Sequence, residues 1–195
     1  MQLSRTDWIE AGLEMIEREG VSGLRLAVLA KRLAVTKGSF YWHFKDRDDF
    51  LEAIITAWEE DSREFFSEAA KEPDPAARMR RLTALLGERL GRKRGRFPDH
   101  TVFAWAHYDR NIARRVAAVE AERLEFMAGA LRELGLDRAE AETRALLSYL
   151  VATAWLERED RCPELIPTHS VFFKLLEERI LLGEGRPAVV AVQAD

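Results

Sequence analysis

Apolar residues recur with the spacing of an α-helix along almost the whole chain, and no segment alternates convincingly in the manner of a strand. Ser4 is a good helix N-cap, Gly20 a good helix stop, and Asp46 a good cap for a long helix that follows. Helices are therefore predicted at 4–20, 26–33, 36–44, 46–70, 75–93, 99–108, 111–134, 138–159 and 169–182. The expected fold class is all-α.

The first three predicted helices are short, and helices of this length are not stable in isolation. They must share one small core, which predicts an N-terminal three-helix head followed by a C-terminal helical-bundle body. We expect a head at 1–50, a body at 51–185, and a loose tail at 186–195 that is rich in small residues, Gly and Pro.

The composition is that of an ordinary folded protein, with 47% hydrophobic and 33% charged residues in 195. Cys162, the single cysteine, excludes an intramolecular disulfide framework and fits a reducing compartment. The first residues lack the apolar region of a secretory signal, and the longest strongly apolar run, 146–155, is too short to span a bilayer. A soluble, cytoplasmic protein without a membrane partner is expected.

The second and third predicted helices are typical of a helix-turn-helix, in which the second member lies in the DNA major groove. Leu26, Leu29, Ala30 and Leu33 follow the i, i+3, i+4, i+7 spacing of a buried stripe. Phe40 and Phe44 continue this core. The outer face of the later helix then keeps Lys37, Ser39, Trp42 and His43, and Gly38 would allow close approach to a phosphate or base edge.

The charge distribution along the chain also favours a DNA-binding segment in this region. Between residues 24 and 47 stand six cations and one acid, a local net charge of +5, whereas the whole chain carries −4. A compact basic segment on an acidic body is expected where a protein contacts phosphates, although a solvated helix face would look similar.

The segment 35–47, Val-Thr-Lys-Gly-Ser-Phe-Tyr-Trp-His-Phe-Lys-Asp-Arg, resembles the signature of the tetracycline-repressor (TetR) family, and the resemblance extends over about residues 4–55. It implies a DNA-binding transcriptional regulator, in most cases a ligand-released repressor that binds a palindromic double-stranded DNA operator as a homodimer. The residues implied to face base edges are Lys37, Gly38, Ser39, Trp42 and His43. Those implied to contact phosphates are Arg25, Thr36, Tyr41, Lys45 and Arg47. For Tyr41, half-buried packing is the alternative.

The head departs from the family pattern in three places. Arg25 and Leu26 stand where Thr or Ser usually begins the second helix, so Arg25 is expected to take over that phosphate contact. Ala34 replaces the usual glycine, and a left-handed conformation there would cost alanine roughly 1 kcal/mol. Ala27 offers no base contact where some relatives use arginine, which would shift specificity to the third helix.

The body resembles the family only in its length and helical content. By that resemblance it would hold a small apolar or amphipathic effector and would pair through its last two long helices. The candidate pocket residues are His100, Phe103, His107, Phe126, Met127, Tyr149 and Trp155, of which about half are expected to be ordinary core. The candidate dimer residues are Leu146, Leu147, Leu150, Val151, Ala154, Phe172, Leu175 and Leu176, and the alternative is that all are core of a monomer.

Other functions find less support in the sequence. The four histidines form no paired motif with Cys or acidic residues, and His100 and His107 are about 10.5 Å apart along a helix, too far to share an ion. No cofactor, no metal and no enzymatic activity are expected. The basic run 92–96 is either a second nucleic-acid patch or a set of cations at a helix C-terminus. A regulator controlled by a partner protein instead of a small molecule stays an open alternative.

Overall fold

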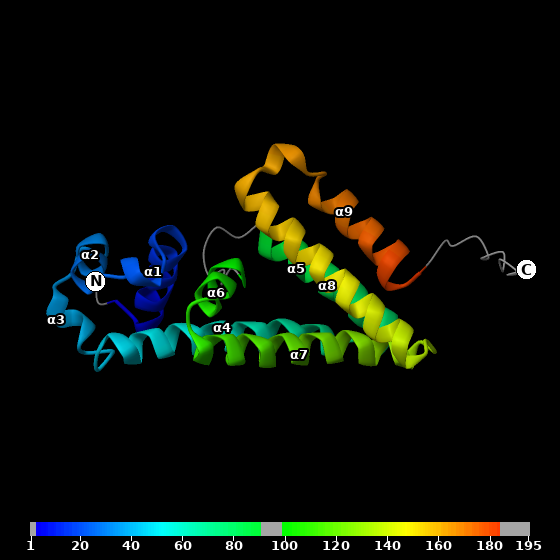
Figure 1. Ribbon diagram of the computed structural model, residues 1–195, viewed down its shortest axis with the longest axis horizontal. Helices are drawn as coiled ribbons and strands as arrows, with labels where there is room; N and C mark the ends of the chain where they lie inside the picture. The colour runs from blue at the N-terminus through cyan, green and yellow to red at the C-terminus, as the bar shows by residue number, and fades with distance from the viewer. Residues whose placement is uncertain (1–2, 91–98, 184–195) are drawn as a thin grey trace, which may run out of the picture. The chain divides into compact units, whose positions relative to one another are not determined.

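The computed structural model describes residues 3–90 and 99–183, and every regular element in these two ranges is helical (Figure 1). The α-helices are α1 (Arg5–Glu19), α2 (Leu26–Arg32), α3 (Lys37–Phe40), α4 (Arg47–Ala70), α5 (Pro75–Leu90), α6 (Asp99–Ala106), α7 (Arg110–Glu133), α8 (Arg138–Arg161) and α9 (His169–Leu175). Short helical turns lie at η1 (Val21–Gly23) and η2 (Pro163–Leu165), and η3 (Leu176–Leu181) continues α9. The all-α prediction is confirmed.

Local sequence signals set the helix ends of the head. The Ser4 hydroxyl accepts the backbone N–H of Asp7 at 3.2 Å while the Asp7 carboxylate accepts the Ser4 N–H at 2.7 Å, a reciprocal capping box. Gly20 ends α1 with φ 71°, and Asp46 caps α4 by accepting the Asp49 N–H at 2.9 Å. All three predicted caps lie where the sequence placed them.

The third helix is shorter than predicted. Helix α3 ends at Phe40, and the next residues are bonded three apart, with the N–H groups of Tyr41, Trp42 and His43 donating to Gly38, Ser39 and Phe40. Bonds of this kind tighten the last turn of a helix. Phe40 and Phe44 are buried on either side of this turn, and Tyr41 and Trp42 within it are exposed. The prediction of a helix through Phe44 is therefore wrong in its last turn.

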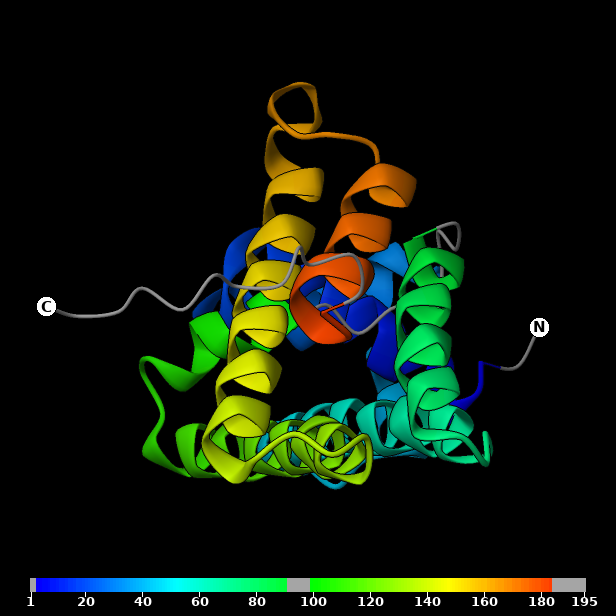
Figure 2. The same cartoon turned by 90° about the vertical axis from the view of Figure 1, so that its right-hand side faces the viewer.

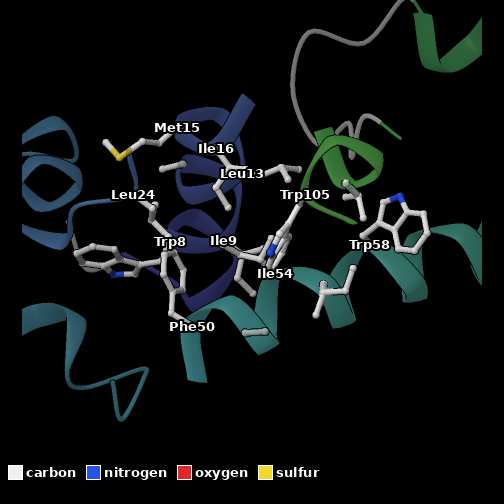
Figure 3. Packing of buried hydrophobic residues seen from close by; sticks show 14 of the residues in the cluster. Trp8, Ile9, Leu13, Met15, Ile16, Leu24, Phe50, Ile54, Trp58 and Trp105 are labelled. Carbon is white, nitrogen blue, oxygen red and sulfur yellow. The ribbon is translucent and has the colours of Figure 1, made fainter. Parts of the chain in front are cut away.

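The chain divides into two compact units, residues 1–64 with 92–120, and residues 65–91 with 121–195. In unit 1, buried residues of α1, α2, α3, α4, α6 and the first half of α7 form one hydrophobic cluster. Figure 3 shows its central part, where Trp105 of α6 lies near Ile9, Leu13 and Ile54. Unit 1 thus extends beyond the head predicted at 1–50, because α6 supplies side chains to the same core.

Unit 2 contains the end of α4, α5, the second half of α7, α8, η2, and α9 with η3. Its apolar core is split into two clusters, one around Met79, Leu131 and Ala145, the other around Ala152, Trp155 and Phe173. The run α9–η3 packs along α8, as Figure 2 shows. The predicted tail at 186–195 and the basic run at 92–96 lie outside the described residues.

Candidate nucleic-acid interface

An aromatic cluster fixes the third helix to the rest of the head. The Phe40 side chain is fully buried, and its ring lies edge-on to Trp8 of α1 at 5.5 Å and to Phe50 of α4 at 5.3 Å between centroids. Phe44 is also buried and contacts Phe50 at 4.7 Å. Both residues are core, as the sequence predicted. Their burial leaves the residues between and beside them little freedom to turn inward.

The turn between α2 and α3 adopts the strained conformation that the sequence raised as a possibility. Ala34 has φ 57°, in the left-handed region that favours glycine. The turn is closed by the Val35 N–H, which donates to the Ala30 carbonyl at 3.0 Å. Thr36 occupies the N-cap position of α3, but its side chain makes no capping hydrogen bond. The Thr36 side chain is exposed. Its hydroxyl is therefore not engaged in capping α3.

The residues predicted to face bases gather on the outer side of α3 and the turn after it. Lys37 and Gly38 are exposed, Ser39 and His43 are partly exposed, and Trp42 is 88% exposed. An exposed indole of this extent has no packing role inside the head. A Cβ added at Gly38 would meet nothing closer than the Thr36 Oγ1 at 3.6 Å, so the head itself does not require a glycine there.

The residues predicted to contact phosphates divide into two groups. Arg25, Tyr41 and Lys45 are exposed. Tyr41 is 53% exposed and its ring packs edge-on against Phe40, so this tyrosine both packs on the core and remains accessible to solvent. Arg25 is the N-cap residue of α2 without a side-chain cap, and its guanidinium lies 3.4 Å from Glu19.

Arg47 differs from the rest of this set. Its side chain is partly buried, and Nη2 donates to the Val21 carbonyl at 2.7 Å while Nε donates to the Leu24 carbonyl at 3.5 Å. Sequence reasoning missed these partners, because no sequence pattern marks a backbone carbonyl as the acceptor for a distant arginine.

The candidate pocket residues fall into both units. In unit 1, His100 lies 3.3 Å from Glu17, Phe103 is packed against the hydrophobic cluster, and His107 is exposed with its Nδ1 2.8 Å from the Phe103 carbonyl. In unit 2, Met127, Tyr149 and Trp155 are buried and Phe126 is partly buried. The exposed position of His107 does not fit a residue that lines an interior pocket.

A polar group interrupts the interior of unit 2. Arg123 is 8% exposed and donates to the Tyr149 hydroxyl at 3.3 Å. Beside Tyr149, the buried Ser148 Oγ has no hydrogen-bond partner, and neither has the buried Trp155 Nε1 two turns further along α8. Buried polar atoms without partners are rare, and a ligand is one way to satisfy them.

An apolar strip covers the outer side of α8 and α9. Exposed members are Leu146, Leu147, Leu150 and Leu175, each between 44% and 52% exposed, while Val151, Ala154 and Phe172 are partly exposed. Leu176 is different, because it is 5% exposed and belongs to the core of unit 2. The exposed leucines are thus not monomer core.

Within residues 3–90 and 99–183, no three His, Cys, Asp or Glu side chains are grouped so that they could hold a metal ion. In the same ranges no helix is long and apolar enough to cross a membrane.

Comparisons with known proteins agree with the arrangement of the head. The family model described as "Bacterial regulatory proteins, tetR family" matches residues 9–54, which include the whole helix-turn-helix. The HTH-type transcriptional regulator AcrR of Shigella flexneri is 38% identical over 58 residues, 30% of this chain and 26% of that protein. TtgR of Pseudomonas putida is 34% identical over 83 residues, 42% of this chain and 40% of that protein. The matches thus span less than half of either relative.

The fold of the whole chain is shared with solved structures. A transcriptional regulator from Rhodococcus sp. Rha1 has a TM-score of 0.70 at 19% identity, covering 93% of this chain and 97% of that one. AmtR of Mycobacterium smegmatis has a TM-score of 0.66 at 18% identity, covering 95% and 89%. These likenesses extend the common fold beyond the head. Residues 9–54 thus match the TetR family model, and the chain shares the all-helical fold of these solved structures.

Proposed function

We propose that this protein binds a two-fold symmetric DNA operator as a homodimer and that a small molecule releases it. The observation that carries DNA binding is a contrast in burial within residues 37–44 of the head. Phe40 and Phe44 are buried, whereas Lys37, Tyr41 and Trp42 between and before them are exposed. A rigid aromatic core therefore presents a cation, a hydroxyl and an indole together on one surface.

The chemistry of these side chains fits duplex DNA. Lysine can donate to the O6 and N7 acceptors of guanine, and an apolar ring can contact the methyl group of thymine. We assign base edges to Lys37, Gly38, Ser39, Trp42 and His43, and phosphates to Arg25, Thr36, Tyr41 and Lys45. One such helix reads few base pairs, so useful selectivity needs two heads on one duplex.

The exposed leucines of α8 and α9 support the homodimer. Four exposed leucines on adjacent helices form an apolar strip of the kind that marks an interface. A second copy is the occupant that two heads on one palindromic duplex require, and the two copies would form a four-helix bundle.

The polar interruption in unit 2 supports an amphipathic effector. Ser148 lies on α8 between Ala145 of one apolar cluster and Ala152 of the other. An apolar molecule with a hydrogen-bond acceptor would satisfy the Ser148 hydroxyl while its remainder contacts either cluster. Such a molecule releases DNA only to the extent that it prefers the conformation that binds DNA less well.

The decisive experiment is selection of bound sequences from random duplex DNA with the purified protein. Enrichment of a palindromic sequence supports the proposal, and recovery of unenriched sequences contradicts it. A compound screen for release of the selected duplex then tests the effector. Ser148→Ala should change the response to an effector while leaving ligand-free DNA affinity unchanged, and the exposed Ser170→Ala should change neither. If no compound releases the duplex, control by a partner protein is favoured instead.

A further inference from the structure

The Arg47 guanidinium closes the helix-turn-helix on itself. Arg47 is the first residue of α4, and its two acceptors, the Val21 and Leu24 carbonyls, lie immediately before α2. All of α2, the turn and α3 stand between these bonded positions. The contact therefore joins the two ends of the segment proposed to read DNA.

Both ends of this contact are held in place. On one side, Gly20 with φ 71° and the short helix η1 form a compact turn, in which the Leu24 N–H donates to the Val21 carbonyl at 3.2 Å. Leu24 itself is buried in the head core. On the other side, the Lys45 N–H donates to the Asp49 carboxylate at 2.9 Å and Asp46 caps α4. Arg47 thus connects two ordered backbone segments.

The chemistry of the side chain suits this task. The planar guanidinium presents several donors in a fixed fork and can bond two carbonyls at once, which a lysine ammonium on its flexible stem does less well. Bonds from a charged donor are also stronger than those between neutral groups. The two donors that bond these carbonyls are directed to the backbone, so they are not available to a phosphate at the same position.

We infer that Arg47 is a positioning residue, which fixes the orientation of α2 and α3 at the start of α4, and not a phosphate ligand. This inference rests on the proposed DNA binding for its effect on affinity. Loss of the contact lets the reading segment shift relative to α4, so specific binding weakens. Binding to random DNA depends on exposed cations, and it stays nearly the same.

The test compares Arg47→Lys and Arg47→Gln with Lys45→Gln, which removes an exposed neighbouring cation. Affinities for the selected operator and for a random duplex are measured over a salt series. Both Arg47 variants should lose about tenfold or more in operator affinity, with an unchanged salt slope. Lys45→Gln should weaken both duplexes and reduce the slope by about one unit.

A measurement without DNA separates this inference from the proposed function. Hydrogen exchange of the Gly23 and Leu24 amides should become about tenfold faster in both Arg47 variants and remain unchanged in Lys45→Gln. Faster exchange supports the positioning role even where no operator is found. The inference is overturned if Arg47→Lys matches the parent protein in exchange and in operator affinity. Loss of one unit of salt slope in Arg47→Gln, with exchange unchanged, overturns it as well.

Discussion

Arg115 of α7 holds Glu59 of α4 through two parallel hydrogen bonds, from Nε to Oε1 at 2.7 Å and from Nη2 to Oε2 at 3.0 Å. The same guanidinium also contacts Thr56 and Glu52, so it links three successive turns of α4. Both charged side chains are mostly buried, at 20% and 13% exposure. This network ties α7 to the part of the long helix α4 that belongs to unit 1.

The network predicts acid sensitivity. The Arg115 hydrogen bonds and charge lower the pKa of Glu59 below its ordinary value of 4.5, against the opposing effect of burial. A carboxylate with a lowered pKa stabilises the fold above its ordinary pKa, and this stabilisation is lost as the pH falls through the lowered value. The unfolding free energy should therefore fall below about pH 4.5, and less steeply in Glu59→Gln. Equal slopes in denaturant titrations of the two proteins from pH 6 to 3 would contradict this.

Removing the arginine should cost more than removing its neighbour. Arg115→Met leaves two carboxylates without their shared partner and should lower the unfolding free energy by about 2–3 kcal/mol. The control is Arg114→Met, which removes an exposed guanidinium from the same helix and should cost within about 0.5 kcal/mol. Chemical denaturation at pH 7 measures both unfolding free energies. Similar losses in the two variants would show that the Arg115 network does not stabilise the fold more than an exposed arginine does.

The turn between α2 and α3 should be improved by glycine. Ala34 has φ 57°, so Ala34→Gly relieves backbone strain and should raise the unfolding free energy by about 0.5–1 kcal/mol after the greater entropy of unfolded glycine is counted. Ala27→Gly, at an exposed position inside α2, should instead lower it by about 0.5–1 kcal/mol. Thermal unfolding that moves in the same direction for both variants would refute the strain at Ala34.

The two proposed classes of DNA contact should respond differently to substitution. Lys37→Ala should relax the preference at one or two base pairs of each half-site, at a cost of about 1–3 kcal/mol there. Lys45→Ala should weaken all sequences alike. Repeating the selection with each variant measures the preference directly. If Lys37→Ala keeps the parental preference and Lys45→Ala changes it, the assigned roles are reversed.

The apolar strip should determine the oligomeric state. Leu150→Asp places a charge at the centre of the proposed interface, where it would be buried without a partner, so it should yield monomers and abolish specific DNA binding. Leu165→Asp, on η2 and 75% exposed, is the matched control and should remain dimeric. Light scattering at micromolar concentration distinguishes the two. A parent protein of 22.4 kDa, with and without DNA, would exclude the dimer.

Local signals explain what could be predicted from the sequence. The caps at Ser4 and Asp46 and the stop at Gly20 depend on residues within one turn of the helix end, and all three are found as predicted. The burial of Phe40 and the exposure of Trp42 follow from the apolar spacing of Phe40 and Phe44, which Trp42 does not share. The end of α3 was misplaced, because one turn with hydrogen bonds three apart is too short for its period to be told from that of an α-helix in sequence.

Contacts between distant segments could not be predicted. The acceptors of Arg47 are backbone carbonyls more than twenty residues away, and such acceptors leave no mark on the sequence. The inclusion of α6 in the core of unit 1 depends on Val102 and Trp105. A helical sequence pattern indicates that such residues are buried, but it does not indicate which other helix they pack against. The misplacement of Leu176 on the proposed dimer strip has the same origin, since two faces of one apolar helix look alike in sequence.

The exposure of Trp42 gives the head an optical probe of its own. The chain has five tryptophans, all in the described ranges, and the other four, Trp8, Trp58, Trp105 and Trp155, are at most 7% exposed. A water-soluble collisional quencher therefore reaches one indole far more readily than the rest. Intrinsic fluorescence in its presence follows the accessibility of the proposed DNA-binding surface in the unlabelled protein, separately from the packing of the hydrophobic clusters of the two units.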